Sequence, residues 1–168
     1  MTEQDLISGF VDLAGSLMNT EPFRRMKQYE HHGQIDTHFH SVHVAFRVYK
    51  ACIKKQMSKS ETEEITTAAL LHDLYLYNWY TDKHDEWHAF YHPKQAVKNI
   101  EKYELVKLTD MQREMILRHM FPLGKFPKSY GGFLLTLCDK YCAALELTGI
   151  IEDFKEIYDD INRRVYYA

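Results

Sequence analysis

The sequence predicts an all-α protein, a compact bundle of about seven to eight helices in one domain spanning residues 1–168. Apolar residues recur at spacings of three and four along most of the chain, which is the period of an amphipathic helix. Stretches with the pattern of a helix cap separate these segments. No run of alternating apolar and polar residues predicts a strand. A chain of 168 residues is also long enough to bury one substantial core.

The first 33 residues predict two helices and a break. The apolar stripe of a helix over about residues 3–18 consists of Leu6, Phe10, Leu13 and Leu17. Thr20 and Pro22 then predict the start of a short second helix, with proline in its first turn. A break follows at Gly33, and we expect the adjacent His31 and His32 to be solvated rather than bound to a metal.

A third helix is predicted from residue 36 or 37 to about residue 57. Its apolar stripe contains Val44, Val48 and Ala51. Extending this stripe back by one turn places His40 on the buried face. His43 shares part of that face, whereas His38 is expected to point away from it.

A fourth helix is predicted to begin at a capping box formed by Ser60 and Glu63. Its buried stripe is Ile65, Ala68 and Ala69, followed by His72. Asp73 comes directly after His72, so two ionisable side chains fall at the buried end of one helix. Because burying a charge is costly unless something pairs with it, a metal ion that binds both residues is one explanation.

Residues 74–87 are aromatic and irregular. We expect a long loop that is held by its own rings. The alternative is a pocket wall in which Tyr75 and Trp79 stack on a planar substrate.

Four further segments are predicted after this loop. His92 and Pro93 are expected to begin a helix with proline at its first position, and its inward residues are Ala96, Ile100 and Tyr103. A capping box at 109–112 begins a helix with the stripe Met115, Ile116 and His119. After a turn at 122–132, an apolar helix over about 133–147 carries Asp139 on its buried face. An amphipathic helix over about 152–166 is expected to serve packing alone.

Composition excludes several classes of protein. A formal net charge of -3 gives no basic surface for nucleic acid. No apolar run approaches the about 18 residues of a membrane span, and the N-terminus lacks the pattern of a signal peptide. The cysteines form no disulfide framework, which favours a soluble cytoplasmic protein; they are Cys52, Cys138 and Cys142. Cys138 and Cys142 lie one helical turn apart and could share a metal, but burial as free thiols is favoured.

Six side chains able to bind a metal fall on or near the inward faces of five predicted helices. They are His40, His72, Asp73, His92, His119 and Asp139. A single buried histidine is usually a hydrogen-bonded core residue, but six such groups would each need a separate partner. Four imidazoles and two carboxylates suit Fe, Mn or Zn better than calcium, and they leave room for two divalent ions.

The order of these six residues resembles the HD-domain superfamily of metal-dependent phosphohydrolases. The resemblance covers about residues 37–145, and its strings are His40–Ala45, Leu70–Asp73, His92–Pro93 and Asp139–Lys140. It implies that His40, His72, Asp73 and Asp139 hold one metal. It also implies that Asp73 bridges to a second metal, which His92 and His119 complete. His88, one turn before His92, is the alternative ligand and otherwise has a substrate-side role.

The resemblance implies hydrolysis of a small-molecule phosphomonoester or phosphodiester, with nucleotides among the candidates. Two ions would lower the pKa of a bridging water, and the hydroxide would attack phosphorus. Asp73 is the bridging catalytic residue that the resemblance implies. Arg118, next to His119, and Lys140, next to Asp139, are candidate catalytic cations, although adjacency to a ligand on a helix favours exposure to solvent. Residues 74–77 depart from the Gly or Lys that many hydrolases of the superfamily carry there.

Two alternative functions stay open. A smaller branch of the superfamily uses the same six ligands to hold two irons and activate oxygen, so a di-iron oxygenase is the first alternative. The second is a non-catalytic module that binds a ligand. Neither a nucleic acid polymer nor a membrane is expected as a partner, and a homodimer is compatible with the sequence.

Overall fold

The computed structural model of the chain describes residues 1–32, 35–83 and 85–167, with the backbone alone at His32. These ranges contain eight α-helices, one short 3-10 helix and one two-stranded sheet, which confirms the predicted all-α class. The helices are α1 (Glu3–Met18), α2 (Glu21–Arg25), α3 (Thr37–Lys54), α4 (Lys59–Leu71), α5 (His88–Lys102), α6 (Asp110–Arg118), α7 (Tyr130–Thr148) and α8 (Glu152–Tyr166). No described helix is both long enough and apolar enough to cross a membrane.

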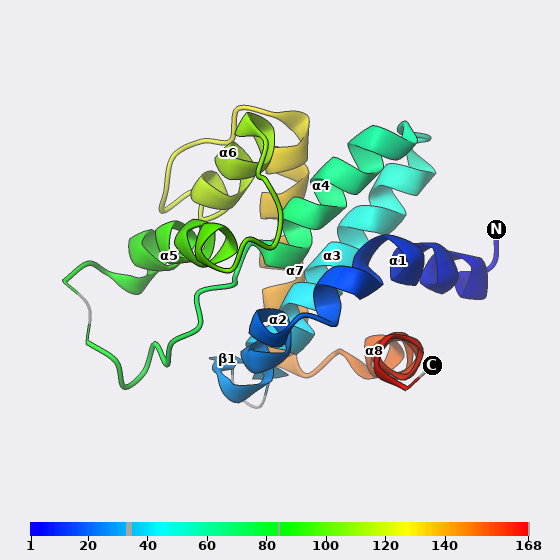
Figure 1. Cartoon of the computed structure of the whole chain (residues 1–168), viewed down its shortest axis with the longest axis horizontal. Coiled ribbons are helices and arrows are strands. Elements are labelled where there is room, and N and C mark those ends of the chain that lie inside the picture. Colours follow the sequence, from blue (N-terminus) through cyan, green and yellow to red (C-terminus); the bar gives the residue numbers. More distant parts are fainter. Residues whose placement is uncertain (33–34, 84, 168) are drawn as a thin grey trace.

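Helix α3 is the centre of the fold. It packs side by side with α4, and α7 packs against both, while α1 and α8 cover the side away from α5 and α6 (Figure 1). Thirteen of its 18 residues are buried. A helix that is buried nearly all round has no solvent face to which a polar side chain can turn.

That position explains one wrong prediction. His38, expected to point away from the core, is fully buried. Its Nδ1 and Nε2 atoms each lie 2.8 Å from a tyrosine hydroxyl, those of Tyr158 and Tyr166 on α8. Burial, with a smaller contribution from Lys27, lowers the pKa of His38 to about 3, so the ring is neutral. The predicted bounds of α8 are confirmed, and the helix packs on α1 and α3.

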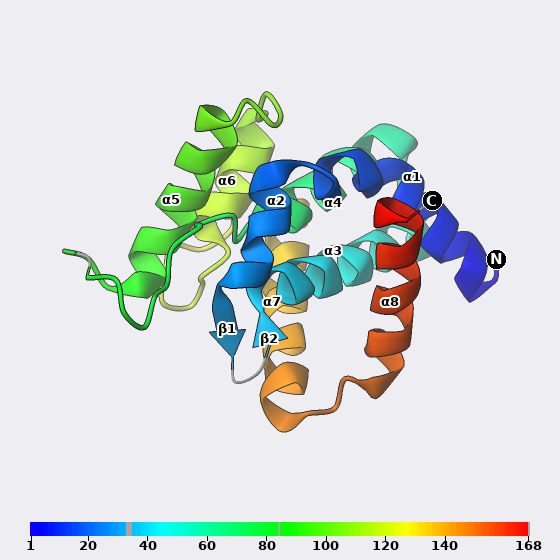
Figure 2. The same ribbon diagram turned by 60° about the horizontal axis from the view of Figure 1, so that its bottom comes forward.

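A short hairpin precedes α3, although no strand was predicted. The 3-10 helix Met26–Gln28 leads into β1 (Glu30–His32), which pairs antiparallel with β2 (Ile35–Asp36). Figure 2 shows both strands beside the first turn of α3. Strands of two and three residues are too short to show the alternation that identifies a strand in a sequence.

The predicted capping box of α4 is displaced by two residues. Ser58 is the N-cap, its hydroxyl accepts from the amide of Glu61, and the Glu61 carboxylate accepts from the amide of Ser58. The pattern Ser-x-x-Glu occurs twice in succession, at 58–61 and at 60–63, and Ser60 lies inside the first turn. The second predicted box, at Thr109, is confirmed.

Two helices begin earlier than the sequence predicted. Helix α5 begins at His88, so Pro93 lies inside the helix rather than at its first position. The additional turn carries His88, whose ring stacks on that of His92 with centroids 4.6 Å apart. Helix α7 begins at Tyr130, capped by the Ser129 hydroxyl, which accepts from the amide of Gly132.

Candidate metal centre

The six predicted metal ligands converge at one place in the core. His40 lies in the first turn of α3, His92 in the second turn of α5 and Asp139 in the middle of α7. His72 and Asp73 directly follow α4, and His119 directly follows α6. At most 5% of any of the six residues is exposed.

The carboxylate of Asp73 lies between two pairs of imidazoles. Its Oδ2 atom is 3.6 Å from Nε2 of His72 and 3.9 Å from Nε2 of His40. Its Oδ1 atom is 3.3 Å from Nε2 of His92 and 3.6 Å from Nε2 of His119. Each oxygen of one carboxylate therefore faces its own pair of ring nitrogens.

Asp139 completes one of the two sides. Its Oδ1 atom lies 3.1 Å from Nε2 of His40 and 3.9 Å from Nε2 of His72. Two ligands that are each about 2.1 Å from one ion can lie at most about 4.2 Å apart. Ligand atoms of His40, His72 and Asp139 all lie within 4.8 Å of one another, and those of His72, Asp73 and His119 form a second such group.

Backbone carbonyls orient three of the four imidazoles. The Nδ1 atoms of His72, His92 and His119 lie 2.8, 2.9 and 2.7 Å from the carbonyl oxygens of Ala69, His88 and Ile116. A carbonyl oxygen only accepts, so each Nδ1 carries the proton, and each Nε2 directs a lone pair at the centre. Metal-binding histidines are oriented in the same way in proteins.

Several buried polar atoms at the centre have no suitable protein partner. Nε2 of His72 and Oδ1 of Asp73 make no hydrogen bond to any described residue. Nε2 of His92 and Nε2 of His119 lie 2.9 Å apart with both protons committed to carbonyls. Unpaired buried polar atoms cost about 1–3 kcal/mol each. A cation would satisfy all four atoms, so these residues fit a metal ion.

The charges of the side chains also suit a cation. Burial alone would raise the pKa of Asp73, but the imidazoles of His72 and His92 hold it well below its usual range. Burial would also raise the pKa of Asp139, but the hydrogen bond from His40 and the positive charge of Lys140 hold it well below its usual range. Burial and the neighbouring His92 lower the pKa of His119 to about 3. The carboxylates are therefore ionised and His119 is neutral at pH 7, as metal ligands must be.

Glu146, on α7, is a site residue that the sequence analysis missed. Its carboxylate accepts from Nδ1 of His40 at 2.7 Å and from Nδ1 of His43 at 2.8 Å. Burial opposes its charge, but the two imidazoles, His40 foremost, lower the pKa of Glu146 to about 2. Glu146 lies seven residues after Asp139, which is two helical turns along the same face. That spacing could have identified it.

His40 differs from the other three imidazoles because it lies between two carboxylates. Burial would lower its pKa, but Glu146 and Asp139 raise it to about 10. Without a metal His40 is therefore a cation that donates through both nitrogens. A metal ion would take the place of the Nε2 proton.

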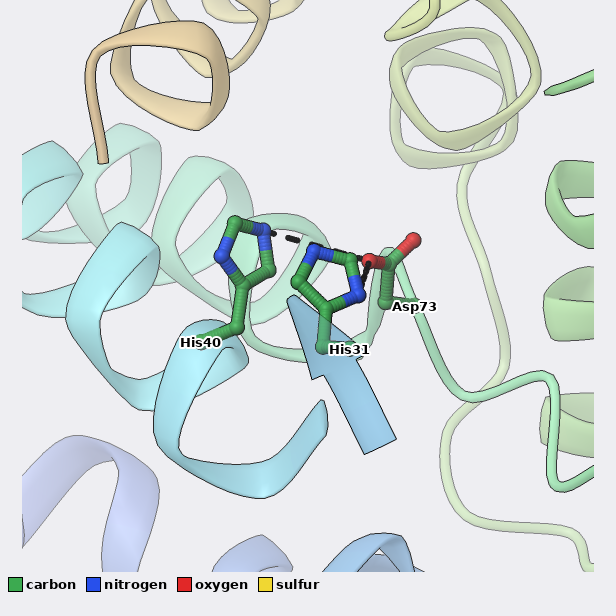
Figure 3. A group of neighbouring side chains, drawn as sticks. All are labelled: His31, His40 and Asp73. Atoms are coloured by element: carbon green, nitrogen blue, oxygen red, sulfur yellow. Dashed lines mark ion pairs between the residues drawn. The ribbon is translucent and has the colours of Figure 1, made fainter. Parts of the chain in front are cut away.

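His31, predicted to be solvated, is buried against the centre. Only 7% of it is exposed, and Nδ1 lies 3.8 Å from Oδ2 of Asp73. Its ring packs on that of His40 with centroids 3.9 Å apart, and Figure 3 shows both imidazoles beside the Asp73 carboxylate. The pairing of β1 with β2 holds His31 here, and no periodic pattern in the sequence marks that placement. The side chain of His32, which shared this prediction, lies outside the described part of the chain.

Of the two predicted catalytic cations, one lies at the rim of the centre and the other is directed away from it. The ammonium of Lys140 donates to Oδ2 of Asp139 at 2.7 Å, and 41% of its side chain is exposed. Lys140 therefore lies at the rim of the centre. Arg118 donates instead to the carbonyl of Phe126 at 2.8 Å and pairs with Glu114 at 3.7 Å, so it is directed away.

The predicted substrate-side rings line the approach from α5. Trp79 is half-buried and stacks on His88, with centroids 4.9 Å apart, and His88 stacks in turn on His92. Nδ1 of His88 is 2.9 Å from the hydroxyl of Tyr77. Tyr75 is almost fully buried. His92 therefore reaches the centre directly, and His88 lies one layer further out.

The cysteines belong to no metal-competent group among the described residues. Cys142 is buried, and burial raises the pKa of its thiol. A protonated thiol is a poor metal ligand, which agrees with the expectation of a free buried thiol at Cys142, whereas Cys138 is only half-buried.

Comparisons with protein-family models, with curated proteins and with solved structures find no match to this chain. Fold and site together define its class: an all-α protein with a buried cluster of histidines and aspartates that could hold a metal ion.

Proposed function

We propose that this chain is a metal-dependent phosphohydrolase of the HD-domain type, with two divalent ions at the centre and Fe, Mn or Zn as the suitable metals. The observation that carries the proposal is the carboxylate of Asp73, each oxygen of which faces a separate pair of imidazole nitrogens. A carboxylate shared in this way is typical of sites in which two ions act on one phosphate.

The chain's own residues hold this arrangement before any substrate binds. Bound divalent ions supply a water of lowered pKa and positive charge for the phosphoryl oxygens. The carbonyls of Ala69, His88 and Ile116 keep three imidazoles in one tautomer. Lys140 adds a positive charge at the rim, where an anionic group would approach. These groups require little reorganisation during a reaction.

A groove on α5 and α6 is a candidate site for a small substrate. It has a volume of about 860 Å³ and lies between α5 and the segment that follows α6. Pro93 and Met120 line it, and each directly follows a residue of the centre. Lys94 and Lys125 also line it, together with Glu86, which pairs with Lys94 at 2.7 Å. The volume is in the range of small-molecule pockets, and Lys125 is a cation that could meet the charge of a phosphoester.

A di-iron oxygenase is the second candidate. The observation that favours it is the aromatic segment after Asp73, where Tyr75 is 1% and Tyr77 is 9% exposed. Many hydrolases of the HD-domain type have Gly or Lys in this segment. Purification without oxygen, followed by iron analysis, separates the two candidates. An oxygenase requires iron and consumes oxygen, whereas a hydrolase releases phosphate without oxygen.

The proposal is tested with protein loaded separately with Mn²⁺, Fe²⁺ and Zn²⁺. A panel of nucleotides, sugar phosphates and cyclic dinucleotides is screened for hydrolysis. The double variant His72→Ala, Asp73→Ala should lose both metal and hydrolysis, and Asp12→Asn, at an exposed carboxylate of α1, should retain both. If the double variant hydrolyses the panel as well as the wild type does, the centre is not the active site. If no phosphoester is hydrolysed, a non-catalytic module is favoured.

A further inference from the structure

His31 is close enough to the centre to share an ion with it. Nδ1 of His31 lies 3.8 Å from Oδ2 of Asp73, the oxygen that faces His40 and His72. Ligand atoms of His31, His40 and Asp73 all lie within 4.8 Å of one another. The 3.8 Å separation is below the about 4.2 Å limit for two ligands of one ion.

Nδ1 of His31 faces the hydroxyl of Tyr75 at 3.5 Å and Oδ2 of Asp73 at 3.8 Å. The Thr37 hydroxyl donates its one hydrogen to the carbonyl of Tyr29 at 3.0 Å. The Tyr75 hydroxyl therefore donates its own hydrogen to Thr37, also at 3.0 Å, and turns a lone pair toward Nδ1 of His31. The ring nitrogen is thus directed at the same carboxylate oxygen that faces His40 and His72.

We propose that His31 is an additional ligand of the ion on the His40 side of the Asp73 carboxylate, where its ring nitrogen forms one group with the ligand atoms of His40 and Asp73. This inference rests on the metal centre of the proposed function. His31 comes from β1, outside the five helices that supply the other ligands, and its ring is already packed on His40. Its nitrogen is thereby held in place before an ion binds, which lowers the entropic cost of coordination.

The additional ligand makes the two ion positions unequal. The ion beside His40 would gain one protein ligand from His31, whereas the ion beside His92 and His119 has three, including Asp73. An ion with few protein ligands keeps open positions for water and substrate. The substrate therefore binds on the side of His92 and His119, which is the side of the groove lined by Pro93 and Met120.

The test measures ion binding rather than turnover. Metal affinity is measured by competition with a chelator, for Mn²⁺ and Zn²⁺, on the wild type, His31→Phe and Glu30→Gln. Phenylalanine retains a ring against His40 but has no ligand nitrogen. Glu30 is an exposed neighbour on the same strand and is the matched control. We expect two affinities in the wild type, and in His31→Phe an at least about tenfold loss at the tighter site alone. The Co²⁺ absorption spectrum should change in His31→Phe and not in Glu30→Gln.

The outcomes separate this inference from the proposed function. If the wild type binds no ion, both are overturned. If His31→Phe binds with wild-type affinities and an unchanged Co²⁺ spectrum, the His31 ligand is overturned and the metal centre stands. If His31→Phe loses hydrolysis but keeps the wild-type metal affinity, His31 acts on the substrate, and the His31 ligand is again overturned. Thermal unfolding in excess chelator shows whether His31→Phe folds, and His31→Leu replaces it if it does not.

Discussion

The Nε2 atoms of His92 and His119 lie 2.9 Å apart, although each ring donates its Nδ1 proton to a backbone carbonyl. When both rings are neutral, as metal ligands must be, two lone pairs face each other between α5 and the end of α6. Without a cation this contact is repulsive in a buried site of low polarity. A bound cation turns the same geometry into a pair of ligands.

Divalent ions should therefore stabilise the fold. At an ion concentration one hundred times Kd, the expected gain is about 2.7 kcal/mol for one site. Thermal unfolding with and without Mn²⁺ or Zn²⁺ measures it. His119→Met removes one of the two facing lone pairs, so its ion-induced shift in unfolding temperature should be smaller than that of the wild type. Equal shifts in the two proteins would contradict a role for His119 in ion binding.

Replacing Asp73 should affect both ions, because each carboxylate oxygen faces a different pair of imidazoles. We expect Asp73→Asn to lose most of its bound metal at both positions. Asp139→Asn should lose only the ion beside His40. Metal content after gel filtration gives the stoichiometry, with Asp12→Asn as the control. If Asp73→Asn and Asp139→Asn lose equal amounts of bound metal, Asp73 does not bridge two ions.

The metal content of two further variants should show that His92, and not His88, is a ligand. Nε2 of His92 lies 3.3 Å from Oδ1 of Asp73, whereas Nδ1 of His88 lies 2.9 Å from the hydroxyl of Tyr77. His92→Ala is expected to lose the second ion. His88→Ala should retain metal and change KM for the substrate, because His88 lies in the outer ring layer. Retention of both ions in His92→Ala together with a loss in His88→Ala would reverse the assignment.

Glu146→Gln should weaken metal binding by about 10–100-fold, since Glu146 orients His40. It should also change the pH dependence of stability in the presence of chelator. The pKa of Glu146 is lowered from 4.5 to about 2, so its contribution is present above about pH 4.5 and is lost toward pH 2. The pKa of His40 is raised from 6.5 to about 10, so its contribution is present below about pH 6.5 and is lost toward pH 10.

The difference in unfolding free energy between wild type and Glu146→Gln should therefore be largest between about pH 4.5 and 6.5. Urea denaturation at several pH values measures it. A difference that does not vary with pH would show that the ion pair is not what Glu146 contributes.

Ser58→Ala should destabilise the protein by about 1 kcal/mol, because Ser58 caps α4. Ser60→Ala is the matched control, since Ser60 lies in the first turn and is exposed. It should change the unfolding free energy by less than about 0.5 kcal/mol. Chemical denaturation measures both losses. A larger loss of unfolding free energy in Ser60→Ala than in Ser58→Ala would show that Ser60 is the N-cap.

Much of the fold and most of the centre could be predicted from local patterns. The spacing of apolar residues in α3, α4 and α6 places His40, His72 and His119 inward, because a helix repeats every 3.6 residues whatever surrounds it. The errors occur where two local patterns compete, as at Ser58 and Ser60. They also occur where rings extend a helix beyond its sequence signal, as at His88.

Three side chains at or near the centre depended on packing between distant segments. His31 is in a strand too short to have a period, and it is buried where β1 lies against α7 and its ring packs on His40. His38 is buried because α8 covers α3, a contact across about 120 residues of chain. Glu146 acquires its role only when α7 lies against α3. Helical periodicity is a property of neighbouring residues and can be read locally. The atoms that one side chain meets across the core are set by how whole helices pack.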